Sequence, residues 1–205
     1  MYLVTGGTGF IGRALVRHLF DTGERVRTLV RPSPRTPRLP TGISLEVAVS
    51  SLSDSRGLRA ALSGVDTVIH LASAEGQGNR GSLLTTDIEG TRNLAEAAAD
   101  AGVKRIIYLS HLGADRMSAF PVLKAKGIAE DYIRRSGVPF TIIRSSIVFG
   151  PEDRFTVPLA RLLRLAPGLL PLPGGGRAVV QPLWVEDLVT CLLWAADNED
   201  MANQT

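Results

Sequence analysis

The chain has 205 residues and a net charge of +3 at pH 7; 44% of its residues are hydrophobic, 21% are charged and 5% are aromatic. These values predict a globular chain with a substantial core, and the weak, dispersed charge with few aromatic residues argues against a nucleic-acid partner. No apolar stretch approaches the length of a membrane span, and the N-terminal apolar run indicates a strand rather than a signal peptide. The single cysteine, Cys191, lies in the apolar run LVTCLLWAA, which predicts a small core residue, no internal disulfide and a cytoplasmic location.

The first predicted elements are a strand at residues 2–5 and an amphipathic helix at 10–22, joined by a glycine-rich turn. Glycines permit a tight turn and let backbone N–H groups approach a pyrophosphate, while the helix N-terminus supplies partial positive charge. Because the turn lies between a strand and a helix, it predicts a dinucleotide site. The candidate contacts in this turn are Gly6, Thr8, Gly9, Phe10, Ile11 and Gly12.

Strands and helices then alternate along the chain. Further strands are predicted at 25–30, 44–49, 66–71, 104–110 and 139–144, and further helices at 55–63, 84–101 and 122–136. A glycine follows each of the four helices, at positions 23, 64, 102 and 137, and marks where it ends. This alternation predicts an α/β fold of the Rossmann type, a doubly wound parallel sheet with helices on both faces and ligands at the carboxyl ends of the strands.

The chain divides into two parts on composition. Residues 1–150 are predicted to form the dinucleotide-binding domain. Residues 151–205 begin with an apolar helix (157–165) and a loop rich in proline and glycine, followed by a return strand and a final helix at QPLWVEDL. We interpret this second part as an apolar lid, a loop and a final helix that begin a truncated or minimal substrate-binding region.

The ordered segments resemble the short-chain dehydrogenase/reductase superfamily, in its atypical and extended branches of epimerase/dehydratase-like and NmrA-like proteins. The resemblance rests on VTGGTGFIG at 4–12, DTVIHLAS at 66–73, DIEGTRNLAEAA at 87–98, KRIIYLSHLGA at 104–114, KAKGIAEDYIRRSGVPFTIIRSSIVFG at 124–150 and QPLWVEDL at 181–188. It implies an NAD(P) cofactor and a small-molecule ligand. Extended relatives continue past this point, so the resemblance also implies a truncation or an absent C-terminal subdomain, with a pocket open on that side.

The choice of cofactor is predicted from the end of the second strand. Arg31 stands where NAD-preferring dehydrogenases usually carry an acidic residue, and Ser33 and Arg35 follow it. An arginine here suits a ribose 2′-phosphate, so we predict NADP(H) in preference to NAD(H). The alternative interpretation is a solvated loop, which the prolines at 32, 34, 37 and 40 keep irregular.

The resemblance places the adenine pocket after the third strand, at Ser51 and Leu52, and the ribose and phosphates beside Leu71, Ala72 and Ser73. We interpret His70 as a strand-end residue with a backbone partner rather than a catalyst. The polar residues Asp87, Thr91 and Asn93 match a polar face of the family, and we interpret them as residues that hold loops in place.

Proton transfer is where the chain departs from the family. Hydride-transfer members generally carry a tyrosine with a lysine four residues later, and none of Tyr2, Tyr108 and Tyr132 has a lysine at that spacing. Counted back from the end of its helix, Lys126 matches the family lysine, which leaves Val122 at the tyrosine position.

The candidate catalytic residues are therefore Ser110, His111 and Lys126. Lys126 can also hold the nicotinamide ribose, and Ser145 after the sixth strand completes the predicted cofactor contacts. His111 could act as a general acid in place of the phenol. The alternatives are a structural or exposed loop histidine and a solvated helix lysine. No metal site is predicted.

Two classes of function follow from this sequence. The first is an NADP(H)-dependent oxidoreductase or epimerase-like enzyme with a nonstandard proton donor. The second is a catalytically silent NAD(P)-binding regulator, redox sensor, or assembly or accessory subunit. The substrate and the oligomeric state cannot be read from these residues.

Overall fold

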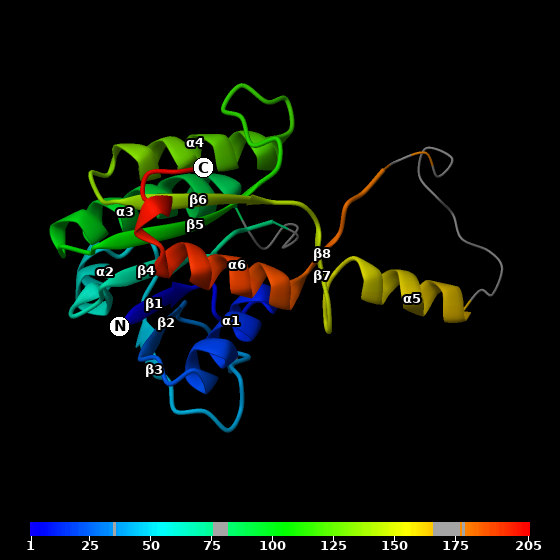
Figure 1. The fold of residues 1–205 in the computed structure, drawn as a ribbon, viewed down its shortest axis with the longest axis horizontal. Coiled ribbons are helices and arrows are strands. Elements are labelled where there is room, and N and C mark those ends of the chain that lie inside the picture. Colours follow the sequence, from blue (N-terminus) through cyan, green and yellow to red (C-terminus); the bar gives the residue numbers. More distant parts are fainter. Residues whose placement is uncertain (35, 76–81, 166–176, 178) are drawn as a thin grey trace.

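Figure 1 shows the computed structural model of the chain, which describes residues 1–34, 36–75, 82–165, 177 and 179–205. The main sheet contains six parallel strands, each pair in parallel register. Its strands are β1 (Tyr2–Thr5), β2 (Val26–Val30), β3 (Glu46–Val49), β4 (Thr67–His70), β5 (Arg105–His111) and β6 (Phe140–Ser145). They lie in the order β3-β2-β1-β4-β5-β6, so the direction of winding reverses between β1 and β4. This is the predicted doubly wound sheet, and a ligand crevice is expected where the winding reverses.

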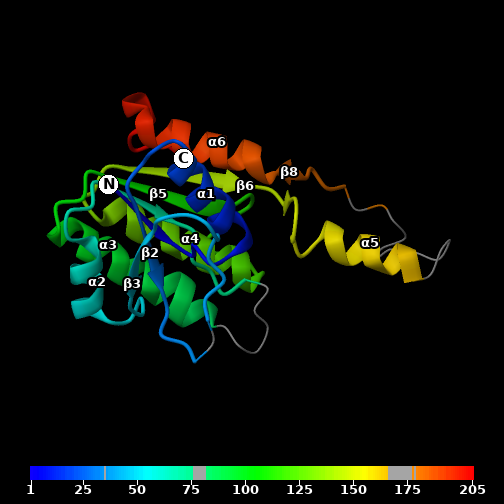
Figure 2. The same ribbon diagram turned by 90° about the horizontal axis from the view of Figure 1, so that it is seen from below.

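Helices cover both faces of the sheet (Figures 1 and 2). One face carries α1 (Phe10–Asp21) and α6 (Val185–Asp197), and the other carries α2 (Ser55–Leu62), α3 (Gly90–Asp100) and α4 (Pro121–Arg135). Alternate strand residues enter the two cores: Leu3 and Ile106 face α2, α3 and α4, whereas Val4 and Ile107 face α1 and α6. The near-continuous apolar strands of this sequence are what a sheet buried on both faces requires.

The predicted boundaries are close to those observed. Gly23, Gly64, Gly102 and Gly137 all have φ between 69° and 79°, which confirms them as glycine stops after helices. The predicted helix at 84–101 is divided into a short π-helical segment, η2 (Leu84–Glu89), and α3. A small second sheet, β7 (Val148–Phe149) with β8 (Leu183–Trp184), was predicted only in its second strand.

The described residues of the second part of the chain are less buried than those of the first. Helix α5 (Thr156–Leu165) has no buried residue, and both views show it pointing away from the sheet. After α6 comes a short 3-10 turn, η4 (Glu199–Met201), and the backbone N–H of Ile142 in β6 donates to Gln204 at 3.0 Å. The C-terminal residues are thereby attached to the edge of the main sheet.

The prediction for Cys191 is wrong, because this residue is exposed. Helix α6 buries Val185, Leu188, Leu192 and Ala195 on one face, and Cys191 lies outside that stripe. Helix α6 carries apolar residues on its exposed face as well as on its buried face, so the sequence did not show on which face Cys191 lies. Within the described residues, no helix combines the length and the apolar character needed to cross a membrane.

Candidate functional site

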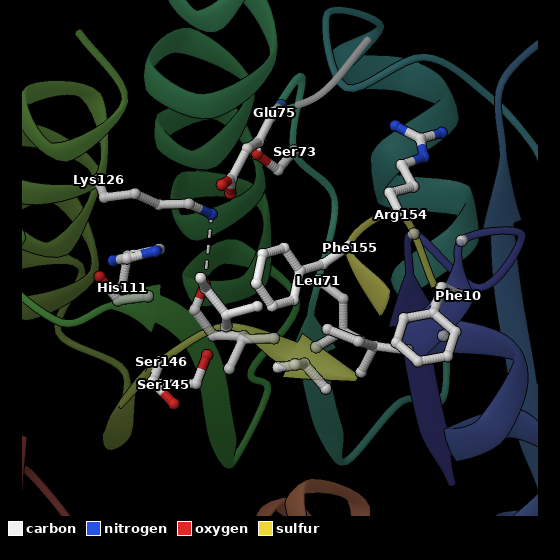
Figure 3. Close-up of a pocket in the computed structure, with 18 residues that line it drawn as sticks. Phe10, Leu71, Ser73, Glu75, His111, Lys126, Ser145, Ser146, Arg154 and Phe155 are labelled. Atoms are coloured by element: carbon white, nitrogen blue, oxygen red, sulfur yellow. Dashed lines mark hydrogen bonds between the residues drawn. The ribbon is translucent and has the colours of Figure 1, made fainter. Parts of the chain in front are cut away.

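Two adjoining hollows lie at the carboxyl edge of the sheet, where β1 and β4 end. The larger has a volume of about 440 Å³ and the smaller about 150 Å³. Of the predicted residues, the larger is lined by Gly6, Gly9, Phe10, Ile11, Gly12, Leu71, Ser73, Ser110, His111, Lys126 and Ser145. The smaller is lined by Gly6, Thr8, Gly9, Arg31, Leu52, Leu71, Ala72 and Ser73. Figure 3 shows Lys126 and His111 at one end of the larger hollow and Phe10 and Arg154 at the other.

The glycine turn separates the two hollows, and its glycines have different surroundings. Gly6 has φ of +78°, and a Cβ added there would lie 2.8 Å from the backbone nitrogen of Ala72. A Cβ at Gly12 would lie 2.2 Å from the carbonyl oxygen of Gly6, so this glycine allows α1 to start against the turn. Gly9 has an ordinary φ of −77° and little protein around it, yet it lines both hollows. A turn open at Gly9 beside a helix N-terminus fits a dinucleotide pyrophosphate.

The smaller hollow contains most of the residues predicted for the adenosine end. Arg31, at the end of β2, lines it together with Leu52 and Ala72. Neither Ser33 nor Ser51 is among the residues that line this hollow. Ser33 is exposed, and the Ser51 hydroxyl lies 2.8 Å from the Ser53 hydroxyl. Arg35 lies outside the described residues.

The loop after β4 is held by a buried carboxylate on η2. Asp87 is fully buried and accepts hydrogen bonds from the Ser73 hydroxyl at 2.6 Å and from the Ala74 N–H at 2.9 Å. On α3, the Asn93 amide donates to the Leu52 carbonyl at 3.0 Å. Asp87 and Asn93 therefore hold the loops that line the smaller hollow, as expected.

His70 lies beneath the site rather than in it. Its Nδ1 is 2.6 Å from the Thr5 hydroxyl and its Nε2 is 2.9 Å from the Thr91 hydroxyl, so its partners are two side chains and not the expected backbone group. Complete burial, together with the charge of Lys126, lowers its pKa from 6.5 to about 3. The ring stacks on Tyr108, with centroids 5.4 Å apart. Burial also raises the pKa of Tyr108 well above its usual value, so this phenol is a poor substitute for the family tyrosine.

Lys126 is buried and is not a solvated helix lysine. Its Nζ lies 3.4 Å from the Asp87 carboxylate, donates to the Leu109 carbonyl at 3.3 Å and lies 5.2 Å from the centre of the Tyr108 ring. The same side chain lines the larger hollow. A cation so placed can donate to ligand hydroxyls while its charge is balanced within the protein. Val122, one turn earlier on α4, has no proton to give.

Ser110 and His111 end β5 at the wall of the larger hollow. The Ser110 hydroxyl donates to Glu130 at 2.5 Å. His111 is partly exposed, and its Nδ1 is 2.7 Å from the carbonyl oxygen of Leu112. Because a carbonyl only accepts, Nδ1 carries the hydrogen, which leaves Nε2 of the neutral ring as an acceptor. The register of β5 and β6 places Ser145 beside His111.

The loop after β7 adds residues that the sequence analysis did not assign to the site. Asp153 is buried and accepts from the backbone N–H groups of Gly150, Phe155 and Thr156. Burial acts against these contacts, but their sum lowers the pKa of the carboxyl well below its usual value. Asp153 thus fixes the loop whose Arg154 and Phe155 line the larger hollow. The sequence did contain a signal for this loop, because Asp153 precedes the helix that begins at Thr156 and aspartate is typical of helix N-termini. The other lining residues outside the predicted set include Glu75, Ser146, Ile147 and Val148.

Comparison with known families gives one match over most of the chain. The family described as NAD(P)H-binding matches residues 6–154, a segment that contains the glycine turn and every residue lining the two hollows except Thr5 and Phe155.

Curated relatives extend the comparison to nearly the whole chain. A ceramide reductase of Caulobacter vibrioides is 33% identical over 93% of this chain and 59% of its own length. Subunit 9 of the NADH dehydrogenase [ubiquinone] 1 alpha subcomplex of Arabidopsis thaliana, a mitochondrial protein, is 31% identical over 96% of this chain and 50% of its own length. The chain therefore spans about half to three fifths of the length of these two relatives.

Solved structures share the fold. A short-chain dehydrogenase/reductase superfamily protein from Agrobacterium tumefaciens, crystallised with bound NAD, superimposes with a TM-score of 0.78. It is 27% identical, and the match covers 100% of this chain and 76% of that one.

Proposed function

We propose that this chain, which belongs to the NAD(P)H-binding family of the short-chain dehydrogenase/reductase superfamily, binds NADP(H) across the two hollows and acts as an oxidoreductase or epimerase-like enzyme on a small molecule. The observation that carries the proposal is the glycine turn, which opens at Gly9 into both hollows at once. A dinucleotide has two halves joined by a pyrophosphate, and this arrangement has one compartment for each half.

The preference for NADP(H) is supported by Arg31 in the smaller hollow. A guanidinium can hold a 2′-phosphate through charge-assisted hydrogen bonds, whereas NAD(H) offers only a hydroxyl at that position. We expect Arg31→Ala to weaken NADPH binding at least about tenfold and to leave NADH binding nearly unchanged. Calorimetric titration with both nucleotides measures this. Equal affinities for NADPH and NADH that do not respond to the substitution would remove the argument.

The proposed chemistry rests on three side chains at the wall of the larger hollow. When bound, the nicotinamide would supply or accept a hydride. Lys126 would hold the ribose hydroxyls, and His111 would exchange the proton at Nε2 in place of the missing phenol. The neutral ring would accept this proton from an alcohol that is oxidised, and the imidazolium would return it to a carbonyl oxygen that is reduced. Ser110 would orient the reacting oxygen of the ligand.

Turnover tests this assignment. On a panel of carbonyl compounds and sugar nucleotides, His111→Ala should abolish the NADPH-dependent activity. Lys124→Ala should leave it intact, because Lys124 is exposed and does not line the hollow. Full activity in the His111 variant would mean that another group or a bound water moves the proton.

The second candidate is an NAD(P)-binding protein without catalytic activity, such as an accessory or assembly subunit. Val122 at the tyrosine position favours it, and so does the likeness to a subunit of a respiratory NADH dehydrogenase. Stoichiometric binding of NADPH without turnover on the whole panel would favour this candidate over the enzyme.

A cytoplasmic location stays a prediction from the single cysteine.

A further inference from the structure

A fully buried carboxylate lies directly behind the larger hollow. Ser110 on β5 and Arg144 on β6 are register partners, so their side chains project to the same face of the sheet. Helix α4 covers that face and presents Glu130 to both of them. Glu130 has an exposed fraction of 0% and does not line the hollow itself.

Among the residues that the structure describes, every hydrogen bond at the Glu130 carboxylate is one that it accepts. Oε1 accepts from the Ser110 hydroxyl at 2.5 Å and from Nε of Arg144 at 2.9 Å. Oε2 accepts from Arg144 at 2.7 Å and from Arg134 at 2.8 Å. Burial disfavours the charged carboxylate, but donation from Arg144, Ser110 and Arg134 outweighs it and lowers the pKa of Glu130. An ionised carboxylate is an acceptor only, so it cannot donate to Ser110.

The state of Glu130 decides what Ser110 offers to the hollow. A serine hydroxyl has one proton and two lone pairs, and here the proton is committed to Glu130. Ser110 lines the larger hollow, so only lone pairs are left for a ligand there. A ligand hydroxyl can donate a hydrogen bond to this oxygen. A ketone or aldehyde oxygen placed at the same point could form no hydrogen bond with it, because both oxygens would offer only lone pairs.

The ion pairs of Glu130 with Arg144 and Arg134 do not by themselves require the hydrogen bond from Ser110. Replacing a buried ion pair with apolar residues is often neutral or stabilising, so the cluster of Glu130, Arg144 and Arg134 is weak evidence of a purely structural role. The contact with Ser110 links this cluster to the ligand space, because Ser110 is the member that lines it.

We propose that Glu130 is a positioning residue that fixes Ser110 as a hydrogen-bond acceptor, so that the larger hollow selects ligands with a hydroxyl group over the matching carbonyl compounds. The inference rests on the proposed function only in taking this hollow as the ligand site. It assigns the alcohol, rather than the carbonyl, as the form that binds better at Ser110.

The test uses cyclohexanol and cyclohexanone, which have nearly the same shape and differ in the group offered to Ser110. Saturation-transfer NMR on an equal mixture of the two, with NADPH present, reports their relative occupancy when each signal is divided by the concentration of that probe in the same spectrum. For the unmodified protein we expect the alcohol to be favoured roughly fivefold, the ratio that one hydrogen bond supports. Ser110→Ala should abolish the preference.

Glu130→Gln is the decisive variant. Its amide can donate to the Ser110 oxygen, which frees the serine proton to face the hollow, so the preference should disappear or reverse toward the ketone. Loss of folding would not produce a reversal, and thermal unfolding of each variant verifies that it is folded. Glu96→Gln is the matched control, because Glu96 is exposed on α3 and should keep the original preference.

The outcomes separate this proposal from the proposed function. Equal occupancy of the two probes, binding of neither, or an alcohol preference that persists in Glu130→Gln would overturn the positioning role. NADPH binding is read in the same samples from its fluorescence, and its absence from the unmodified protein would instead overturn the proposed function.

Discussion

Gly9 and Gly12 lie three residues apart in the same turn, but a methyl group would have different consequences at each. The backbone at Gly9 is one that alanine adopts readily, and an added Cβ would lie 3.1 Å from the carbonyl oxygen of Gly6. At Gly12 the corresponding distance is 2.2 Å, and that oxygen cannot move without moving the turn.

We therefore expect Gly12→Ala to lower the free energy of unfolding by roughly 1–3 kcal/mol, as overpacking does. Gly9→Ala should lose less stability than Gly12→Ala, because its added Cβ lies farther from that oxygen, and it should weaken NADPH binding about tenfold, because its methyl group would occupy space in the hollows. Denaturant unfolding and calorimetry measure the two effects. The account fails if both variants lose stability alike, or if Gly9→Ala binds NADPH normally.

His70 should make stability depend on acid. Its pKa is lowered from 6.5 to about 3 in the folded chain, so between these values the unfolded chain binds a proton that the folded chain does not. The free energy of unfolding therefore has its full value above about pH 6.5 and decreases as the pH falls toward 3. At pH 4.5 it should be lower by roughly 3 kcal/mol.

Chemical denaturation at a series of pH values measures this dependence. In His70→Asn the decrease between pH 6.5 and 4.5 should shrink, whereas His18→Asn, at a partly exposed position on α1, should behave like the unmodified protein. An unchanged pH profile in the His70 variant would exclude this histidine as its source.

Some residues of the site could be predicted from sequence and others could not, for a physical reason. The glycine turn and Lys126 follow from spacing, since each stands at a fixed offset from a strand or a helix end. Glu130 was not predicted, because a glutamate on an amphipathic helix usually faces water. Only the pairing of β5 with β6 shows that Ser110 and Arg144 converge on it, where Arg134, one turn later on α4, joins them.

Among the elements, α6 depends on a contact from the sheet. Arg105, the first residue of β5, donates to the carbonyl of Ala195 at 3.2 Å and to that of Asn198 at 2.9 Å. These groups belong to the C-terminal end of α6, where carbonyls lack partners within the helix and the dipole favours a cation.

Arg105→Met keeps an unbranched apolar stem, shorter than that of arginine, but removes the donors and the charge. We expect a loss of about 1–3 kcal/mol in the free energy of unfolding, with faster amide exchange in the last turn of α6. Arg59→Met is the control, because Arg59 is exposed on α2 and should change stability by less than about 0.5 kcal/mol. Equal effects of the two substitutions would contradict the capping role.

The succession of strands and helices along the main sheet's part of the chain was predictable, because each strand and helix carries its own periodic pattern and its own stop. The small β7–β8 sheet was not, because each strand has only two residues and their pairing joins segments far apart in the sequence. The π-helical start at η2 was also missed, since its sequence pattern continues without a break into α3.

For the whole molecule, a ligand that binds the folded chain alone must stabilise it. NADPH at about 100 times its dissociation constant should add about 2.7 kcal/mol to the free energy of unfolding, and NADH at the same concentration should add less. Thermal unfolding over a series of nucleotide concentrations measures the effect. A melting temperature that responds to neither nucleotide would argue against a preformed dinucleotide site.

The two hollows share Gly6, Gly9, Leu71 and Ser73 as common walls. A molecule filling either compartment therefore alters the boundary of its neighbour, and thermodynamic reciprocity requires the influence to be equal in both directions. Fragments such as an adenosine phosphate and a nicotinamide nucleoside should accordingly bind interdependently, and their separate affinities will not simply sum to that of the intact dinucleotide.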